Sequence, residues 1–441
     1  MISKKMQVTP IVLLLFAISI TPVTNSRIID IKSTNPFLKD ESETPAIYIK
    51  ASSPYDYGWK AGKQNRILYT LRDLLSRFTK RGKVDEKYVE NQIEAMERDV
   101  VYKEYNTTDY NITIYNVTTD DGFWIKLIRY CSLEGRETPI LMIPGMFENH
   151  LLFDYNEERS LARYLANQSW DVWILDLRTH DADGDPHSSW KNEEYMNKCW
   201  DLDKTYLDKD VVTAVEFIQD KTKKEDGAKK IVFIGHSMGG LLAYAYAELK
   251  DQADLAGMIT IGSPGKASEL KWEFKILQLY LGFTWHGHVY ISSLAPYNLD
   301  PNNLRFIRKI VRAKFFYKAA TGPEIQDTYI ALLDDEPAGA VIDMVYGLDE
   351  DWKSGHWWDP QTGYDYTLNL YKINTPFMAI AGDEDTLAKP GDIRAAYENV
   401  SSDDKTIKNY TDYGHVDLLL GDNARIDVFP DIAEWLAARY K

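Results

Sequence analysis

The sequence predicts an α/β fold, in which helices cover both faces of a mostly parallel, doubly wound sheet. Short apolar runs rich in Val and Ile recur between residues 112 and 382. The last five lack strict alternation and end at or next to Gly, Ser or Asp, which is typical of buried parallel strands. Helical patterns over 160–168, 210–220 and 240–250 separate several of the runs. In such folds, ligands bind at the carboxyl ends of the strands.

The predicted strands divide the core into two parts, residues 112–265 and 366–441. The runs are ITIYNVTT (112–119), FWIKLIRYC (123–131), PILMIPG (139–145), DVWILDL (171–177), KIVFIGH (230–236), MITIGS (258–263) and PFMAIAG (376–382). Residues 266–365 interrupt the alternation with apolar stretches at helical spacing. We therefore expect this segment to be a mostly helical insertion that caps the sheet.

The N-terminus has the layout of a secretory signal peptide over residues 1–26. Lys4 and Lys5 precede a short apolar run, Ile11–Ile20, which is followed by small and polar residues. A membrane-spanning helix needs about 20 apolar residues, and this run is shorter. We therefore expect an exported protein in a secreted or lysosome-like, extracytoplasmic location. Residues 27–111 are predicted to form an N-terminal leader that packs against the core.

Two further features bear on export. Six Asn-x-Ser/Thr sequons favour a glycoprotein: Asn106, Asn111, Asn116, Asn167, Asn399 and Asn409. The chain has two cysteines, Cys131 and Cys199. A disulfide between them and two unpaired thiols are both compatible with the sequence.

The charge balance limits the partners of this chain. Its 441 residues include 51 Lys and Arg against 67 Asp and Glu, a formal net charge of −16. An acidic surface argues against nucleic acid, whose phosphates need a basic face, and against broad adhesion to anionic membranes. We predict no metal site, since neither cysteine has metal-ligand spacing and the acids of residues 181–185 fit a polar turn better than a calcium loop. The oligomeric state is left open.

The motif Gly235-His236-Ser237-Met238-Gly239 lies between a predicted strand and a predicted helix. In a G-x-S-x-G turn the serine sits on a sharp bend, so that its hydroxyl projects from the edge of the sheet. The small flanking residues let strand and helix approach closely. The following helix N-terminus offers N–H groups to an oxyanion. We therefore expect Ser237 to be a nucleophile.

A serine hydroxyl needs a base, and the base needs an orienting group. His415 follows a strand-like run and precedes the C-terminal helix, and it is the predicted base. Asp385 follows the strand that ends at Gly382, and we favour it over Asp383 as the orienting acid. His236 is a poor candidate for the base, because it adjoins the nucleophile.

The oxyanion of an acyl intermediate needs two donors. The N–H of Met238 directly follows the nucleophile, and the N–H of Met146 lies in the loop after the strand 140–143. Gly145 allows the backbone to turn into the site. We also assign Gly145 and Phe147 to the substrate-binding region.

With these residues in place, the sequence resembles the α/β-hydrolase superfamily and, within it, the acid lipase and gastric lipase group. The resemblance covers about residues 112–441 and is carried by PGM, DVWILDLR, GHSMGG, GDEDTLAKPGDI and YGHVDLLLG. The chain order Ser237, Asp385, His415 is that of α/β-hydrolases. The resemblance implies an α/β-hydrolase fold with a helical cap and a lipase- or esterase-type activity.

Two departures from that group bear on specificity. Those lipases usually have His-Gly-Leu where this chain has Pro144-Gly145-Met146. The stretch SLARYLANQSWDVWILDLR also resembles bacterial-type esterases and polyester synthases, but the synthases use a cysteine nucleophile where this chain has Ser237.

The sequence thus predicts an exported carboxylic ester hydrolase that acts on lipids or other acyl esters without a cofactor. Apolar residues of the insertion could line an acyl pocket or simply pack the cap on the sheet; the candidates are Phe274, Leu277, Leu281 and Trp285. Transient contact with a lipid surface is left open. The alternatives are an acyltransferase with the same triad, a peptidase of this fold, and a non-catalytic binding protein.

Overall fold

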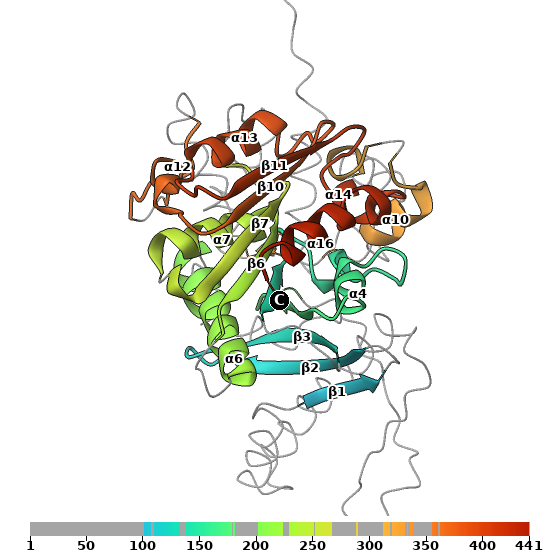
Figure 1. Ribbon diagram of the computed structural model, residues 1–441, viewed down its shortest axis with the longest axis vertical. Helices are drawn as coiled ribbons and strands as arrows, with labels where there is room; N and C mark the ends of the chain where they lie inside the picture. The colour runs from blue at the N-terminus through green and yellow to red at the C-terminus, as the bar shows by residue number, and fades with distance from the viewer. Residues whose placement is uncertain are drawn as a thin grey trace, which may run out of the picture.

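A nine-stranded sheet runs through the part of the chain that the computed structural model describes (Figure 1). Its order is β1-β2-β3-β5-β4-β6-β7-β10-β11. The strands from β5 to β11 are parallel, and β1, β2 and β3 are antiparallel to their neighbours. The strands are β1 (Val101–Asn106), β2 (Tyr110–Thr118), β3 (Trp124–Ser132), β4 (Pro139–Ile143), β5 (Asp171–Asp176), β6 (Ile231–His236), β7 (Leu255–Ile261), β10 (Phe377–Gly382) and β11 (Lys405–Tyr410). The predicted doubly wound, mostly parallel sheet is confirmed.

Helices cover both faces of this sheet. Figure 1 shows α6, α7, α12 and α13 on one side and α4, α14 and α16 on the other. The α-helices are α4 (Leu161–Ala166), α6 (Val212–Thr222), α7 (Met238–Leu249), α10 (Pro323–Ile330), α12 (Tyr366–Asn369), α13 (Pro390–Asn399), α14 (Asp417–Leu420), α15 (Ala424–Asp427) and α16 (Phe429–Ala437). A π-helix, η4 (Leu202–Val211), leads into α6, and 3-10 turns lie at η2 (His150–Leu152), η5 (Gln252–Asp254) and η7 (Leu370–Lys372).

Certain parts of the chain are not described. The described residues are 101–106, 110–132, 138–178, 180, 202–223, 229–250, 252–266, 288–289, 312–317, 320–330, 333, 336–337, 355–359 and 362–440. The predicted signal peptide, most of the predicted leader and Cys199 lie outside them, so the pairing of Cys131 stays open. Pairing of β1 with β2 extends the sheet into the segment assigned to the leader. No helix among the described residues is long and apolar enough to cross a bilayer.

Successive side chains along each central strand point to opposite faces of the sheet, so each strand contributes to two hydrophobic clusters. In β4, Leu141 and Ile143 join the cluster under α6, α7 and α13, whereas Ile140 and Met142 join the cluster under α4 and α16. All four side chains are fully buried. A strand buried on both faces explains why the central runs read as continuously apolar in the sequence.

The insertion leaves and rejoins the sheet at adjacent strands. β7 and β10 pair in parallel, with Met258 opposite Phe377, although more than a hundred residues separate them in the chain. The described part of the insertion contains α10 and a two-stranded sheet of β8 (His288–Val289) and β9 (Glu336–Pro337). The chain therefore leaves the sheet at the carboxyl end of β7 and, after α12 and η7, re-enters it at the amino end of the neighbouring strand β10.

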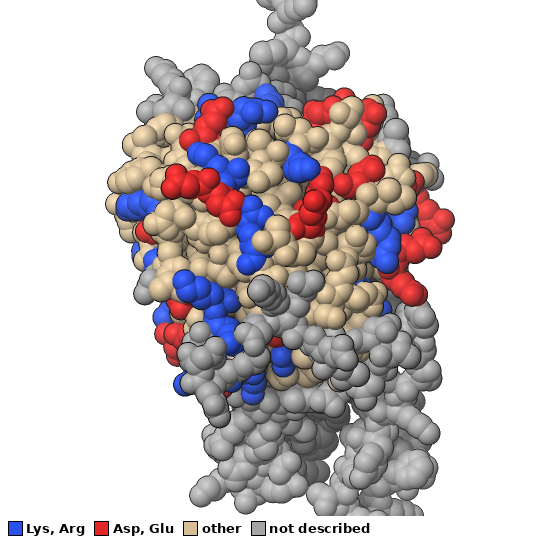
Figure 2. All heavy atoms as spheres, viewed as in Figure 1, with Lys and Arg blue, Asp and Glu red and all other residues tan. Residues whose placement is uncertain are grey.

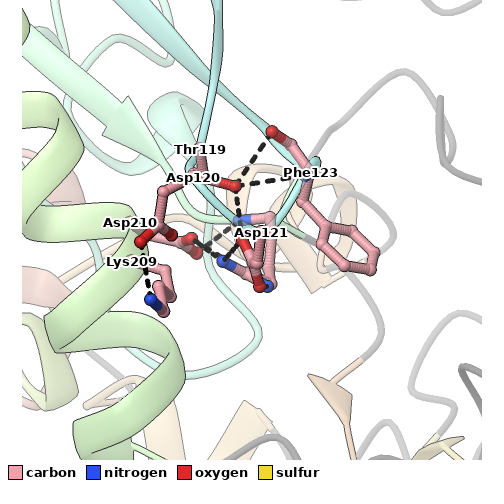
Figure 3. A network of polar contacts seen from close by, with 7 residues as sticks. Thr119, Asp120, Asp121, Phe123, Lys209 and Asp210 are labelled. Carbon is pink, nitrogen blue, oxygen red and sulfur yellow. Dashed lines mark hydrogen bonds and ion pairs between the residues drawn. The ribbon is translucent and has the colours of Figure 1, made fainter.

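A buried arginine fixes the chain where it leaves the carboxyl end of β5. The Arg178 guanidinium is 1% exposed and forms ion pairs with Asp210, at 2.6 Å, and with Asp121, at 2.8 Å. Asp121 lies in the turn between β2 and β3, and Asp210 lies in η4 (Figure 3). Because the donors of a guanidinium are planar, one side chain can join two carboxylates from separate elements. The network thus ties the antiparallel edge of the sheet to the helical layer.

The surface view shows acidic and basic side chains interspersed over one face of the molecule (Figure 2). Among the described residues of that face, blue and red groups lie side by side rather than in separate fields. Lys408 and Asp431, both partly exposed, form an ion pair with a 3.0 Å separation.

Candidate active site

Ser237 occupies a strained turn between β6 and α7. Its backbone has φ 51° and ψ −119°, although it is not a glycine. Such a conformation costs about 1–3 kcal/mol and persists only where the surroundings enforce it. Here the Ser237 N–H donates to the Ile261 carbonyl at the end of β7, at 2.9 Å. The turn therefore has the nucleophile-elbow geometry that the G-x-S-x-G motif predicts.

The glycines of the motif are required by close backbone contacts. A Cβ on Gly239 would lie 2.0 Å from the Ile143 carbonyl oxygen at the end of β4. A Cβ on Gly235 would lie 2.5 Å from the backbone of Gly239. No side chain fits at either position, so α7 starts in direct contact with the strand behind it.

Asp385 and His415 form a buried, hydrogen-bonded pair. Asp385 follows β10, and His415 lies in the loop between β11 and α14. His415 Nδ1 lies 2.7 Å from Asp385 Oδ2, and the two residues are 2% and 3% exposed. Asp385 Oδ1 accepts hydrogen bonds from the N–H groups of Leu387 and Ala388, both at 2.8 Å. The carboxylate is therefore held from both oxygens and can fix the orientation of the imidazole.

The charge of Asp385 acts on the proton affinity of His415. Burial alone would lower the pKa of His415, because it disfavours the imidazolium. The carboxylate of Asp385 outweighs this effect, with smaller contributions from Glu148 and Asp417, and the pKa of His415 is raised above its ordinary value. An imidazole in this position is a stronger base than one in water.

Two contacts bring the His415 loop to the Ser237 turn. Gly262, directly after Ile261, has φ 59°, and a Cβ there would lie 3.2 Å from His415 Nδ1. His236, directly before Ser237, lies with Nε2 3.1 Å from the His415 carbonyl oxygen. His236, which precedes Ser237, and Gly262, which follows the strand end that Ser237 N–H contacts, therefore both lie next to His415. The His415–Asp385 pair thus lies at the same edge of the sheet as the Ser237 turn.

The loop after β4 lies against Ser237. A Cβ on Gly145 would come within 2.9 Å of Ser237 Cβ, so only glycine allows this approach. Met146 and Met238 are buried on either side of the turn, and Phe147 has a positive φ of 64°. The two predicted oxyanion donors thus belong to segments that flank Ser237.

The predicted substrate-binding residues are only partly visible. Phe147 is half-buried and packs against both hydrophobic clusters. The candidates in the insertion, Phe274, Leu277, Leu281 and Trp285, lie outside the described residues. The structure adds a residue from the insertion that sequence reasoning missed: the ring of Phe315 lies 6.1 Å from that of His415, centroid to centroid. The Phe315 carbonyl also accepts a hydrogen bond from Val416 N–H at 2.8 Å.

A second buried carboxylate–imidazole pair was not predicted. Glu148 Oε2 lies 2.7 Å from His236 Nδ1, and both side chains are at most 1% exposed. The sequence places His236 beside Ser237 but does not indicate its partner, and Glu148 has no motif of its own. Among the described residues, no group of three or more His, Cys, Asp or Glu side chains is arranged to hold a metal ion.

Comparisons with known proteins agree with this architecture. Residues 138–301 match the family model described as "alpha/beta hydrolase fold". Together with the sheet order and the turn at Ser237, the match identifies the fold: this chain has the α/β-hydrolase fold.

Among curated proteins, the chain is similar to the poly(3-hydroxyalkanoate) polymerase subunit PhaC of Haloarcula marismortui, with 22% identity over 330 residues. That alignment covers 69% of this chain and 62% of the polymerase subunit, so the chain spans less than two thirds of that relative. Triacylglycerol lipase 1 of Arabidopsis thaliana is 23% identical over 357 residues, which cover 73% of this chain and 86% of the lipase. Among solved structures, a thermophilic esterase from Thermogutta terrifontis superposes with a TM-score of 0.49 at 17% identity, covering 74% of this chain and 99% of the esterase.

Proposed function

We propose that this protein is a serine hydrolase of carboxylic esters, with Ser237 as the nucleophile, His415 as the general base and Asp385 as the residue that orients the base. The observation that carries the proposal is the buried 2.7 Å contact between His415 Nδ1 and Asp385, next to a serine held in a strained turn. A strained backbone costs stability. A serine in such a turn beside a histidine that is paired with an aspartate is the arrangement that acyl transfer requires.

In the first half-reaction, His415 Nε2 removes the hydroxyl proton of Ser237 as its Oγ attacks the acyl carbonyl. The imidazolium that forms is stabilised by Asp385. It then protonates the departing alkoxide, so that an alcohol leaves and an ester to Ser237 remains. In the second half-reaction, His415 removes a proton from water, the hydroxide attacks the acyl-enzyme, and the proton returns to Ser237 Oγ as the carboxylic acid departs.

The negative charge on the carbonyl oxygen needs donors in both half-reactions. We assign them to the N–H groups of Met146 and Met238, since the Gly145 turn packs on Ser237 and α7 begins at Met238. The positive end of the α7 dipole lies at the same place. One such donor contributes about 2.7–4 kcal/mol of barrier reduction in enzymes of this kind.

The proposed substrates are lipids or other acyl esters. Two half-buried aromatic side chains support an apolar acyl group: Phe147 after the oxyanion turn, and Phe315, whose ring lies 6.1 Å from that of His415. The similarity to a protein named triacylglycerol lipase 1 is consistent with this class of substrate. We further propose that residues 1–26 direct export, so that the enzyme acts outside the cytoplasm.

A serine-reactive fluorophosphonate tests the nucleophile. We expect the wild-type protein to be labelled at Ser237 and to hydrolyse acyl esters, and the Ser237→Ala variant to do neither while keeping its thermal unfolding transition. A series of esters of increasing acyl length then defines the acyl preference. Wild-type protein that takes up no label and turns over no ester would favour a non-catalytic binding protein of this fold.

An acyltransferase is the second candidate, because the chain is similar to proteins named as polymerase subunits. In that case an alcohol takes the place of water in the second half-reaction. Product analysis with and without an added acceptor alcohol separates the two. A new ester in place of free acid, at low acceptor concentration, would replace the hydrolase proposal with the transferase.

A further inference from the structure

Glu148 is a buried carboxylate on which three separate parts of the chain converge. Its Oε2 accepts a hydrogen bond from Gly145 N–H at 2.7 Å and lies 2.7 Å from His236 Nδ1. Its Oε1 accepts a hydrogen bond from the Tyr329 hydroxyl of α10 at 3.2 Å. The loop after β4, the end of β6 and the insertion are thus joined at one side chain that is 1% exposed.

The partner imidazole also bridges two segments. His236 Nδ1 faces Glu148, and its Nε2 lies 3.1 Å from the His415 carbonyl oxygen. A carbonyl oxygen can only accept, so Nε2 carries a proton and donates it. Burial alone would raise the pKa of Glu148, but the contact with His236 and the Gly145 N–H lower it overall. The Glu148 Oε2–His236 Nδ1 contact and the hydrogen bond from His236 Nε2 together link the loop after β4 to the main chain of His415.

Stability alone does not account for this pair. A buried pair of polar side chains gains little over an apolar pair of the same volume, because both groups lose their hydration. The contacts of the pair, in contrast, reach the segments that carry Ser237, His415 and the proposed oxyanion donor after Gly145. They comprise the oxyanion turn at Gly145, the residue before Ser237, and the main chain of His415, whose ring lies 4.6 Å from that of His236, centroid to centroid.

We propose that Glu148 and His236 act as a positioning pair, which holds the Gly145 turn and the main chain of His415 at fixed places relative to Ser237. This inference rests on the proposed serine-hydrolase function. Neither residue touches the reacting atoms. Their loss lets the base and the oxyanion donors drift, which weakens binding of the transition state more than binding of the substrate.

Substitutions of His236 separate the two contacts. In His236→Asn, the amide nitrogen replaces Nδ1, so the contact with Glu148 is kept and the contact with the His415 carbonyl is lost. In His236→Gln, the amide nitrogen reaches the place of Nε2 and keeps the contact with His415. In Glu148→Gln, an amide oxygen at the place of Oε2 still faces Gly145 N–H and His236 Nδ1, but it lacks the charge of a carboxylate, which weakens both contacts.

The experiment measures ester hydrolysis by the full-length wild type and the three variants. We expect Glu148→Gln and His236→Asn to lower kcat by about 10- to 100-fold, with KM within about twofold of the wild type. The Kd of a trifluoromethyl ketone, which forms a tetrahedral oxyanion adduct on the serine, should rise by the same factor as kcat falls. His236→Gln should retain a higher kcat than His236→Asn.

Asp171→Asn is the matched control. It breaks the bidentate pair with Arg129, at 2.8 and 2.9 Å, at the amino end of β5, the edge of the sheet away from the site. We expect it to lower the free energy of unfolding without a change in kcat or in the Kd of the ketone. A variant at Glu148 that does not fold leaves the two His236 variants to decide.

The outcomes are distinct. Wild-type kcat in both Glu148→Gln and His236→Asn would overturn the positioning pair while the hydrolase proposal stands. An equal fall of kcat in Asp171→Asn would also overturn it, since the effect would then follow stability. Equal losses in His236→Asn and His236→Gln would overturn the link to His415. A wild-type protein without ester turnover would overturn the hydrolase proposal and this inference together.

Discussion

Asp385 Oδ2 lies 2.7 Å from His415 Nδ1, whereas Asp383, two residues earlier, accepts a hydrogen bond from Asp412 N–H at 2.7 Å. The two carboxylates therefore give a matched test. We expect Asp385→Asn to lower kcat by about three to four orders of magnitude, because the amide no longer stabilises the imidazolium. Asp383→Asn should leave kcat near that of the wild type. Steady-state kinetics of both variants decide the matter, and a larger loss in Asp383→Asn would exchange their roles.

The raised pKa of His415 predicts the acid side of the pH–rate profile. His415 is a base only when neutral, so kcat/KM should fall as the pH drops through a pKa above the ordinary value of about 6.5. The same shift affects stability. Pairing with Asp385 stabilises the fold fully below about pH 6.5, and this contribution is lost as the pH rises through the folded pKa. A pH titration of kcat/KM with wild-type protein checks the first point; a limb well below pH 6.5 would contradict it.

The close contact at Gly239 predicts that a larger residue there will disturb the Ser237 turn. A Cβ there would lie 2.0 Å from the Ile143 carbonyl oxygen, so Gly239→Ala must push β4 and the turn at Pro144 and Gly145 away from α7. We expect a loss of about 1–3 kcal/mol in the free energy of unfolding, together with a fall in kcat.

Gly391 in α13 is the control for this substitution, because a Cβ there meets no atom within 4 Å. Gly391→Ala should leave kcat unchanged and raise the free energy of unfolding by up to about 1 kcal/mol, since alanine favours the helix. Chemical denaturation of the two variants measures both effects. Equal stability of Gly239→Ala and the wild type would show that the backbone relaxes at no cost.

Asp417 predicts a pH dependence of stability at the contact between the insertion and the His415 loop. Its carboxylate accepts hydrogen bonds from Thr321 Oγ1, from Tyr317 N–H at 2.5 Å and from Gly414 N–H at 2.9 Å. Burial raises the pKa of Asp417 to about 6. The folded state therefore binds a proton that the unfolded state releases near pH 4, and this residue's contribution to stability falls as the pH rises from about 4 to about 6.

The measurement is the difference in free energy of unfolding between the wild type and Asp417→Asn across that range. We expect the wild type to lose stability relative to the variant as the pH rises. A difference that stays constant from pH 4 to pH 7 would mean that the carboxyl has the same pKa in the folded and unfolded states.

The fold and the three triad positions could be predicted because their signals are local. Strand β4 is buried on both faces and reads as an apolar run, and the glycines around Ser237 lie within a five-residue motif. Asp385 and His415 each follow a strand at the distance expected for a catalytic loop. The catalytic roles of these residues stay predictions until the variants are measured.

The contacts behind the triad could not be predicted in this way. Glu148 and His236 are 88 residues apart, His236 and His415 are 179 apart, and Tyr317 and Asp417 are 100 apart. Each pair meets only because the sheet order brings distant loops to one edge. A lone Glu in PGMFEN has no spacing or periodicity that points to its partner, so its function follows from three-dimensional contacts alone.

The direct pairing of β7 with β10 makes the sheet continuous without the insertion that lies between these strands in the chain. Since the chain leaves and re-enters the sheet at neighbouring strands, the sheet itself does not require an insertion of this length. The insertion nevertheless contacts the site, because Phe315 accepts from Val416 N–H next to His415 and Tyr329 donates to Glu148. A redesign of the insertion that aims at a new substrate preference should therefore keep the Phe315 and Tyr329 contacts and vary the rest of the segment.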